Sequence, residues 1–350
     1  MTITNTVSPA LKFGLQLLGL WPGVSYSIIY WSSFMLSMIV MQYFQYLYIL
    51  NHIKVSELLN LVDSIPLALD YGLTIFKLIS LWLHRRVLHE ILTAMDNDWR
   101  ECINVDRQLY VMQMKANISH ICCNAILSFN AIATLLYFVG DYIVHIMFLS
   151  KDYNDTLRRL PLKAQLPYET QQSPLFEIVF AMLLLHVFLH ASAVGIINGL
   201  IFTLVLHVGG QIDIICQKFK NTSENTLFSK TSVPSFGMLI ERHNRIISAS
   251  DNIEKLFSFI ALMQVLWNTL VICSLGFAFT FGKLIANASY EMMWYDMPSK
   301  QSKIIIFIIM RSQKRLTITA GKMTDMSFGA FTSVSFQIFI ILLKDIQLYI

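Results

Sequence analysis

The chain has 350 residues, of which 55% are hydrophobic and 14% are charged. A soluble domain carries about 25% charged residues, so a soluble chain of this composition could not cover its own core. The composition predicts a polytopic membrane protein and excludes a disordered chain, a disulfide scaffold and most soluble enzymes. The net charge of +4 is small, and no basic stripe with interleaved aromatic residues indicates a nucleic-acid partner.

Apolar runs follow one another along the chain. A helix needs about 20 mostly apolar residues to cross a hydrocarbon core of about 30 Å. Five long runs reach this length and one shorter run approaches it, and their continuity favours helices over barrel strands. We predict an all-α transmembrane bundle with about six spans, near 24–50, 65–83, 118–149, 174–208, 256–282 and 327–343.

The segments between the spans show no separate domain. The two largest, 84–117 and 209–255, have mixed charge and are predicted to extend the neighbouring helices. We therefore treat residues 1–350 as a single transmembrane domain.

The distribution of lysine and arginine among the loops predicts the orientation of the bundle. With six spans, each side of the membrane receives 12 basic residues, and the rule gives no answer. One more crossing between residues 256 and 290 changes the counts to 19 and 5, with the amino-terminus in the cytoplasm. The fifth run has 27 residues, whereas two crossings need about 40. The counts therefore predict that one crossing is missing from this chain.

A glycosylation sequon agrees with this orientation. Asn154-Asp155-Thr156 lies between the third and fourth spans, on the outside, so Asn154 is a candidate glycosylation site. Three further sequons, at Asn117, Asn221 and Asn287, fall on or near the inside, where they would not be used.

Ionisable residues interrupt two of the spans. Asp70 and Lys77 lie in the second span and Asp141 lies in the third. Because a charge at membrane depth is costly, such residues usually face a cavity or a partner. They are candidates for a binding pocket or an ion path, although Lys77 could also extend its ammonium group to the inner interface.

His186 and His190, four residues apart on the fourth span, share one helix face. They are either a metal or haem ligand pair or two hydrogen-bonded histidines inside the bundle. No second histidine pair or HExxH motif accompanies them, so we predict no metal and no cofactor. No phosphate loop, nucleophile elbow or paired-carboxylate pattern indicates an enzyme. The 17 methionines and 13% aromatic residues suit a site for small apolar ligands, or simply packing.

Several stretches together resemble the insect odorant receptors, of the hymenopteran type. They are LKFGLQLLGLWPG at 11–23, LHVGGQIDIICQKFK at 206–220, the segment 242–277, and Trp294-Tyr295 followed by IIMRSQKRLTITAGK at 308–322. Within the second stretch, His207 and Gly210-Gln211 are similar to the family's H-x-x-G-Q motif. The resemblance extends over nearly the whole chain.

The resemblance implies a seven-helix receptor subunit with a cytoplasmic amino-terminus, in the plasma membrane of sensory-neuron dendrites. Such subunits form a tetrameric cation channel with a shared co-receptor, and the last helix of each lines the pore. A volatile molecule binds in the outer half of the bundle and opens the pore by binding the open state better than the closed one.

The implied roles can be placed on this sequence. The candidates for ligand binding are the outer-half residues Asp70, Tyr71, Tyr137, Asp141, Phe180 and Leu184. The candidates for the pore are Phe336, Phe339 and Ile340 on the last span. The candidates for subunit assembly lie in a cytoplasmic anchor segment, about 290–322, and are Trp294, Tyr295, Ile305 and Phe307.

Two departures from the family pattern bear on function. The family has a complete sixth helix between motifs like SLGF (274–277) and GKLIANA (282–288), but here only Ala278–Phe281 lies between them. The last span also departs from the family after Phe331-Thr332-Ser333. An incomplete gene sequence, a splice variant or a decaying paralogue would each explain both changes. A non-functional or truncated receptor is therefore the first alternative, and a membrane transporter or metal-binding membrane protein is the second.

Overall fold

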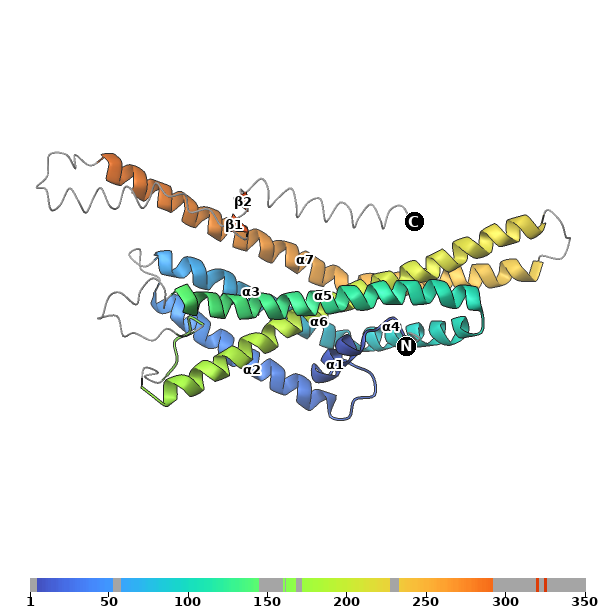
Figure 1. The fold of residues 1–350 in the computed structure, drawn as a ribbon, viewed down its shortest axis with the longest axis horizontal. Coiled ribbons are helices and arrows are strands. Elements are labelled where there is room, and N and C mark those ends of the chain that lie inside the picture. Colours follow the sequence, from blue (N-terminus) through green and yellow to red (C-terminus); the bar gives the residue numbers. More distant parts are fainter. Residues whose placement is uncertain are drawn as a thin grey trace, which may run out of the picture. The chain divides into compact units, whose positions relative to one another are not determined.

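The computed structural model shows an all-α protein, as the apolar runs predict (Figure 1). It describes residues 5–52, 58–144, 160, 162–167, 172–226, 233–291, 319–320 and 324–325. The helices in these ranges are α1 Pro9–Leu17, α2 Ser27–Asn51, α3 Leu58–Leu83, α4 Arg85–Ile103, α5 Asp106–Val144, α6 Leu175–Thr226 and α7 Val233–Glu291. Two short antiparallel strands, β1 Thr319–Ala320 and β2 Thr324–Asp325, pair Thr319 with Asp325.

Five of the described helices are long and apolar enough to cross a membrane. The apolar parts are Ser27–Asn51, Ser64–Leu83, Asp106–Leu136, Leu175–Lys220 and Leu239–Cys273. They overlap the five long apolar runs of the sequence. A helix that is apolar around its whole circumference is stable only in lipid or in a protein core. The chain is thus a multi-pass membrane protein. The shorter run at 327–343 lies outside the described residues.

Three helices, α5, α6 and α7, are much longer than a bilayer requires. At about 1.5 Å per residue, the 52 residues of α6 extend about 78 Å and the 59 residues of α7 about 88 Å. The described parts of the segments 84–117 and 209–255 are accordingly mostly helical, within α4, the start of α5, the end of α6 and the start of α7. Residues 278–281, where the family resemblance expects a further crossing, lie inside the continuous helix α7.

Small residues allow α5 and α6 to pack closely. A Cβ atom on Gly199 would lie 3.3 Å from the sulfur of Cys123, and that thiol donates a 3.2 Å hydrogen bond to the Gly199 carbonyl. One turn away, the Ser119 hydroxyl donates to the Thr203 hydroxyl at 3.1 Å. Close approach and hydrogen bonds between small residues are how membrane helices associate, because lipid gives no hydrophobic drive for it.

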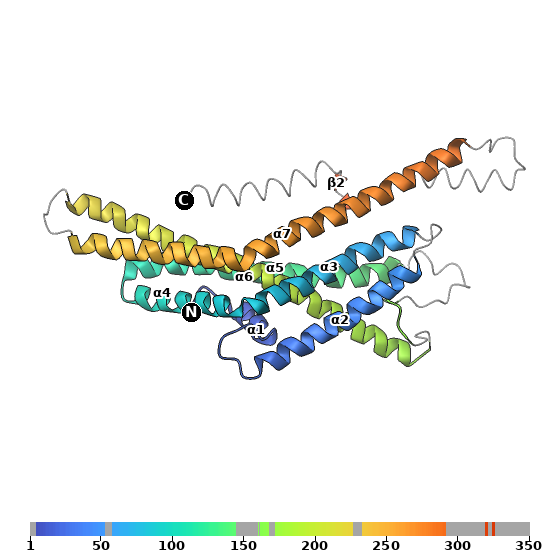
Figure 2. The ribbon, with the colours of Figure 1, turned by 180° about the vertical axis from the view of Figure 1, so that it is seen from behind.

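The amino-terminal segment is built into the bundle. The Ser8 hydroxyl accepts a hydrogen bond from the Leu11 amide and so caps α1, with Pro9 at the first helical position. Leu11 and Leu15 are fully buried in the main core. Gly19 then turns the chain at φ +69, where a Cβ would collide with the Ser27 carbonyl. In both views the amino-terminal segment lies beside α4 (Figures 1 and 2).

The contacts divide the chain into two compact units, residues 1–268 and 269–350. Each is considered by itself. Every site described below lies in the first unit.

Candidate functional site

A cluster of polar and aromatic side chains joins α3 to α6. We call it the His190 cluster, and it consists of Asp70, Tyr71, Thr74, Lys77, His186 and His190. The ring of Tyr71 stacks on the imidazole of His190, with centroids 3.9 Å apart and planes inclined by 8°. Nε2 of His190 lies 3.1 Å from the Thr74 hydroxyl and 3.7 Å from the carboxylate of Asp70. His186 stacks on Tyr71 from further away, at 5.7 Å.

Helical spacing brings these side chains together. Asp70, Thr74 and Lys77 follow one another at four and three residues, so they lie on one face of α3. His186 and His190 are one turn apart on α6. The polar face of α3 therefore lies against the face of α6 that carries the two histidines, within the membrane bundle.

Several buried polar atoms of this region have no hydrogen-bond partner. They are the hydroxyl oxygen of Tyr71, Nε2 of His186 and, on α2, Oε1 of Gln42 and both amide atoms of Gln45. An unpaired buried polar group costs about 1–3 kcal/mol. Native proteins therefore leave few such groups without a partner, a water or a ligand. These atoms can hydrogen-bond a polar group of a molecule that enters the bundle.

Apolar side chains enclose the cluster. Tyr71 packs in a core with Met38 and Met41 of α2 and with Leu183 and Val187 of α6. Methionine adapts to irregular shapes, and aromatic rings give large contact area. The arrangement is suited to holding a small, mostly apolar molecule that carries a polar group.

A segment between α5 and α6 packs onto this core. The side chain of Leu162 is almost fully buried against it. The amide of Gln165 donates to the Phe44 carbonyl of α2 at 3.1 Å, and Asn51 donates to the Gln165 side chain. Residues 162–167 thus fasten α2 beside the His190 cluster.

The structure brings together only part of the predicted ligand site. Asp70 and Tyr71 belong to the His190 cluster, and Leu184 packs against the same core. Phe180 instead pairs with the ring of Phe176, at 6.0 Å. Tyr137 and Asp141 lie on α5 in a part whose side chains are not described.

Sequence reasoning missed several residues of this region. Thr74, Gln42 and Gln45 are not among the predicted site residues. A glutamine inside an apolar span indicates a hydrogen-bond partner on another helix, so Gln42 and Gln45 could have been found from the sequence. For His186 and His190 the sequence predicts either metal ligands or hydrogen-bonded core residues. Within the described residues, no three His, Cys, Asp or Glu side chains are placed to hold a metal ion. His190 instead contacts Thr74 and Tyr71.

The remaining predicted sites lie outside the described residues. They are the pore residues Phe336, Phe339 and Ile340, the assembly residues Trp294, Tyr295, Ile305 and Phe307, and the glycosylation site Asn154.

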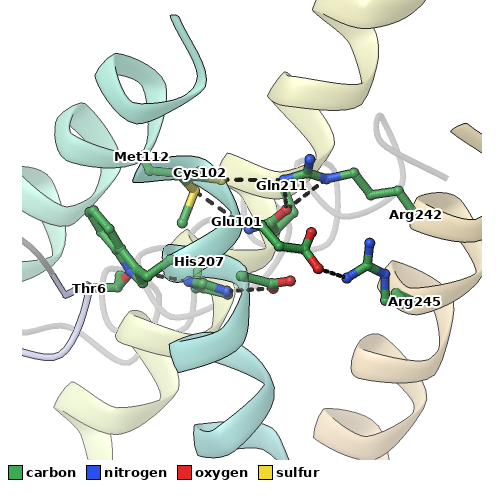
Figure 3. Close-up of polar contacts among 10 residues, drawn as sticks. Thr6, Glu101, Cys102, Met112, His207, Gln211, Arg242 and Arg245 are labelled. Carbon is green, nitrogen blue, oxygen red and sulfur yellow. Dashed lines mark hydrogen bonds and ion pairs between the residues drawn. The ribbon is translucent and has the colours of Figure 1, made fainter. Parts of the chain in front are cut away.

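A second polar group of side chains connects the amino-terminus, α4, α5, α6 and α7 (Figure 3). We call it the Arg242 network, and it consists of Thr6, Asp98, Trp99, Glu101, Cys102, Gln108, Met112, His207, Gln211, Arg242 and Arg245. His207 and Gln211 belong to the H-x-x-G-Q motif noted in the sequence. The motif thus contributes two side chains, one turn apart on α6, to contacts with three other helices and with Thr6.

His207 occupies one side of the network. The Trp99 indole donates to the Thr6 hydroxyl at 2.8 Å, and that hydroxyl lies 3.0 Å from Nδ1 of His207. Nε2 of His207 lies 3.1 Å from the Asp98 carboxylate, which can only accept. A chain of hydrogen bonds from Trp99 through Thr6 and His207 to Asp98 therefore fixes the first residues of the protein against α4 and α6.

Arg242 occupies the other side. Its guanidinium donates to Oε1 of Gln211 at 2.7 and 3.1 Å, to Gln108 at 3.1 Å and to the sulfur of Cys102 at 3.4 Å. Burial raises the pKa of the Cys102 thiol, and the Arg242 hydrogen bond opposes this shift. Arg245, three residues on, forms a 2.6 Å ion pair with Glu101 at the surface.

Comparisons with known proteins show what the whole chain is similar to. A model of the family described as 7tm Odorant receptor matches residues 57–284 and 282–336, so that the two matched segments meet at 282–284. No curated protein matches the sequence significantly. Among solved structures, the olfactory receptor OR5 of the insect Machilis hrabei matches with a TM-score of 0.55 and 14% identity. The match covers 95% of this chain and 96% of that one. Its complex with eugenol matches with a TM-score of 0.54, the same identity and the same coverage.

Proposed function

Because the chain belongs to the insect odorant receptor family, we propose that it binds small volatile molecules and, with a co-receptor, gates a cation channel. Membership makes the chain a membrane receptor and not an enzyme. The observation that carries the binding proposal is the His190 cluster, where unpaired polar atoms lie inside an apolar core.

The ligand site is proposed between α2, α3 and α6. Tyr71 contributes a buried ring and a free hydroxyl, His186 contributes a free ring nitrogen, and Met38, Met41 and Leu183 enclose them. A molecule with one hydroxyl or carbonyl group on a mostly apolar body suits these surroundings. Eugenol, which binds the Machilis receptor, has this chemistry because it carries a phenol on an apolar body.

The orientation is proposed from the basic residues. Eleven lysines and arginines lie in the segments 84–117 and 209–255, at one end of the helices, against five in the segments 52–57 and 145–174 at the other end. This difference supports a cytoplasmic position for the end with eleven. The His190 cluster then lies in the outer half, within reach of ligands from outside. The pore residues and assembly residues named from the sequence remain part of this proposal.

A truncated or non-functional receptor is the second candidate. The family match is divided at 282–284, and α7 passes through residues 278–281 without a turn. Both observations support the proposal that one crossing is missing at this place. Because the missing helix would belong to the bundle, such a chain would be retained in the cell or fail to conduct.

Co-expression separates the two candidates. We would express the chain with an insect co-receptor and record currents evoked by eugenol and a panel of volatile alcohols, ketones and hydrocarbons. A second version would carry a family sixth helix between Phe277 and Gly282, and surface labelling would report delivery to the membrane. Current from the chain itself supports the receptor; current only from the extended version supports truncation. If both versions reach the surface and neither conducts, the channel proposal is wrong.

A further inference from the structure

A cavity of about 190 Å³ lies between α4, α6 and α7, beside the Arg242 network. Its polar lining comes from the network residues Asp98, His207, Gln211, Arg242 and Arg245, and from Glu90, Ser248 and Asn252. Its apolar lining comes from Ile91, Met95, Leu204, Ile246, Ala249 and Ile253.

The residues of the Arg242 network lie together at one end of the cavity. One hydrogen bond of the network joins Asp98 of α4 to His207 of α6. Another joins Gln211 of α6 to Arg242 of α7. The apolar positions lie further along each helix, in the same direction away from these contacts. The cavity therefore has a strongly polar end at the network, and its remaining part is mostly apolar, with Glu90, Ser248 and Asn252 as its polar side chains.

Arg242 at the polar end is a buried cation without an anion. Its side chain donates to two glutamines and a thiol, and none of the described carboxylates lies within 4.0 Å of it. The raised pKa keeps the Cys102 thiol neutral near pH 7. Asp98 is engaged by His207, and Glu101 by Arg245. A buried charge is costly unless an opposite charge compensates it.

We propose that this cavity binds an anionic phospholipid. The head group lies against Arg242 and Arg245, and part of an acyl chain lies along Ile91, Leu204 and Ile253. Arg245 is half exposed, so it can pair with a phosphate at the mouth of the cavity. Glu90 in the lining is exposed, and water screens its charge. The proposal concerns a site distinct from the His190 cluster and does not depend on odorant binding.

Native mass spectrometry of the full chain tests this proposal. The chain, purified in detergent, would be given equal amounts of phosphatidylglycerol and phosphatidylcholine. We expect retained phosphatidylglycerol to exceed phosphatidylcholine by on the order of tenfold, as for a charge-assisted hydrogen bond. Arg242→Gln should reduce the ratio to about one, since the buried cation is gone and the remaining Arg245 is already paired with Glu101.

Two further variants keep the test valid if Arg242→Gln misfolds. Gln211→Glu places a carboxylate on Arg242, so it should replace the lipid anion and abolish the preference while retaining the fold. Ala249→Phe fills the apolar part and should lower retention of both lipids with the arginines intact. Arg100→Gln on α4 and Gln217→Glu on α6 make the same charge changes outside the cavity lining and should leave the ratio unchanged.

Three outcomes would overturn the proposal. The first is a ratio near one for the unaltered chain. The second is an unchanged ratio in folded Gln211→Glu. The third is displacement of the lipid by millimolar inorganic phosphate, which would show that the cavity takes a free anion and not a lipid.

Discussion

The hydroxyl of Thr6 lies 3.0 Å from Nδ1 of His207, 201 positions further along the chain. The same hydroxyl accepts from Trp99 at 2.8 Å, and all three side chains are buried. A residue at the very start of the protein thus completes the hydrogen bonding of α4 and α6.

Thr6→Val should lower stability. The substitution keeps the shape of the side chain but leaves the Trp99 indole and Nδ1 of His207 buried without partners, at a cost of about 1–3 kcal/mol each. The expected result is a lower midpoint of thermal unfolding, measured by fluorescence-detected size exclusion. Thr93→Val, an exposed threonine of α4, is the control and should change little. Equal midpoints for the two variants would contradict the role of Thr6.

Substitutions at Tyr71 should separate packing from hydrogen bonding. Tyr71→Ala removes a fully buried ring stacked on His190 and should cost about 3–5 kcal/mol. Tyr71→Phe keeps the ring and removes a hydroxyl that has no partner, so the unfolding midpoint should stay or rise. A clear loss of stability in Tyr71→Phe would mean that the hydroxyl is bonded in the folded protein.

The same Tyr71→Phe variant should change ligand preference. If a ligand hydroxyl pairs with Tyr71, sensitivity to phenols should fall by about tenfold and that to hydrocarbons should not change. Concentration–response curves for eugenol and for allylbenzene, the hydrocarbon that lacks its oxygen substituents, measure this. Tyr43→Phe, on the exposed face of α2, is the matched control. A parallel shift for both ligands would argue against a hydrogen bond at Tyr71.

Two glycines of α6 should respond differently to a larger side chain. Gly199 packs against Cys123, whereas no atom lies within 4 Å of a Cβ on Gly209. Gly199→Leu should force α5 and α6 apart and destabilise by about 1–3 kcal/mol. Gly209→Leu should be neutral or stabilising, because glycine is unfavourable within a helix. The prediction fails if thermal unfolding shows equal effects at the two positions.

Cysteine labelling should report the orientation. Cys216 is exposed near the end of α6, whereas Cys102 is buried and its pKa is raised. A raised pKa means that the reactive thiolate of Cys102 forms only at higher pH, so near pH 7 a maleimide should spare it. With the proposed orientation, a membrane-impermeant maleimide labels Cys216 only after the cells are permeabilised. Labelling of intact cells that disappears in Cys216→Ser would reverse the orientation.

Hydropathy predicted where the helices lie along the chain, but it did not predict which residues of neighbouring helices contact one another. The long apolar runs coincide with α2, α3, α5, α6 and α7, because each run must satisfy its own backbone in lipid. Of the predicted ligand residues, Asp70, Tyr71 and Leu184 come together, while Phe180 pairs elsewhere. Phe180 and Leu184 are one turn apart, so spacing alone does not tell which of them faces α3.

The amino-acid sequence by itself determined that this protein is a helical membrane protein, since the transfer of apolar residues into lipid is summed along the chain. Only the tertiary structure decided which polar residues meet: Tyr71 with His190, Thr6 with His207, and Arg242 with Gln211. These contacts depend on the rotation of each helix about its axis and on close packing between helices. An apolar helix is almost uniform around its circumference, so its sequence leaves that rotation open.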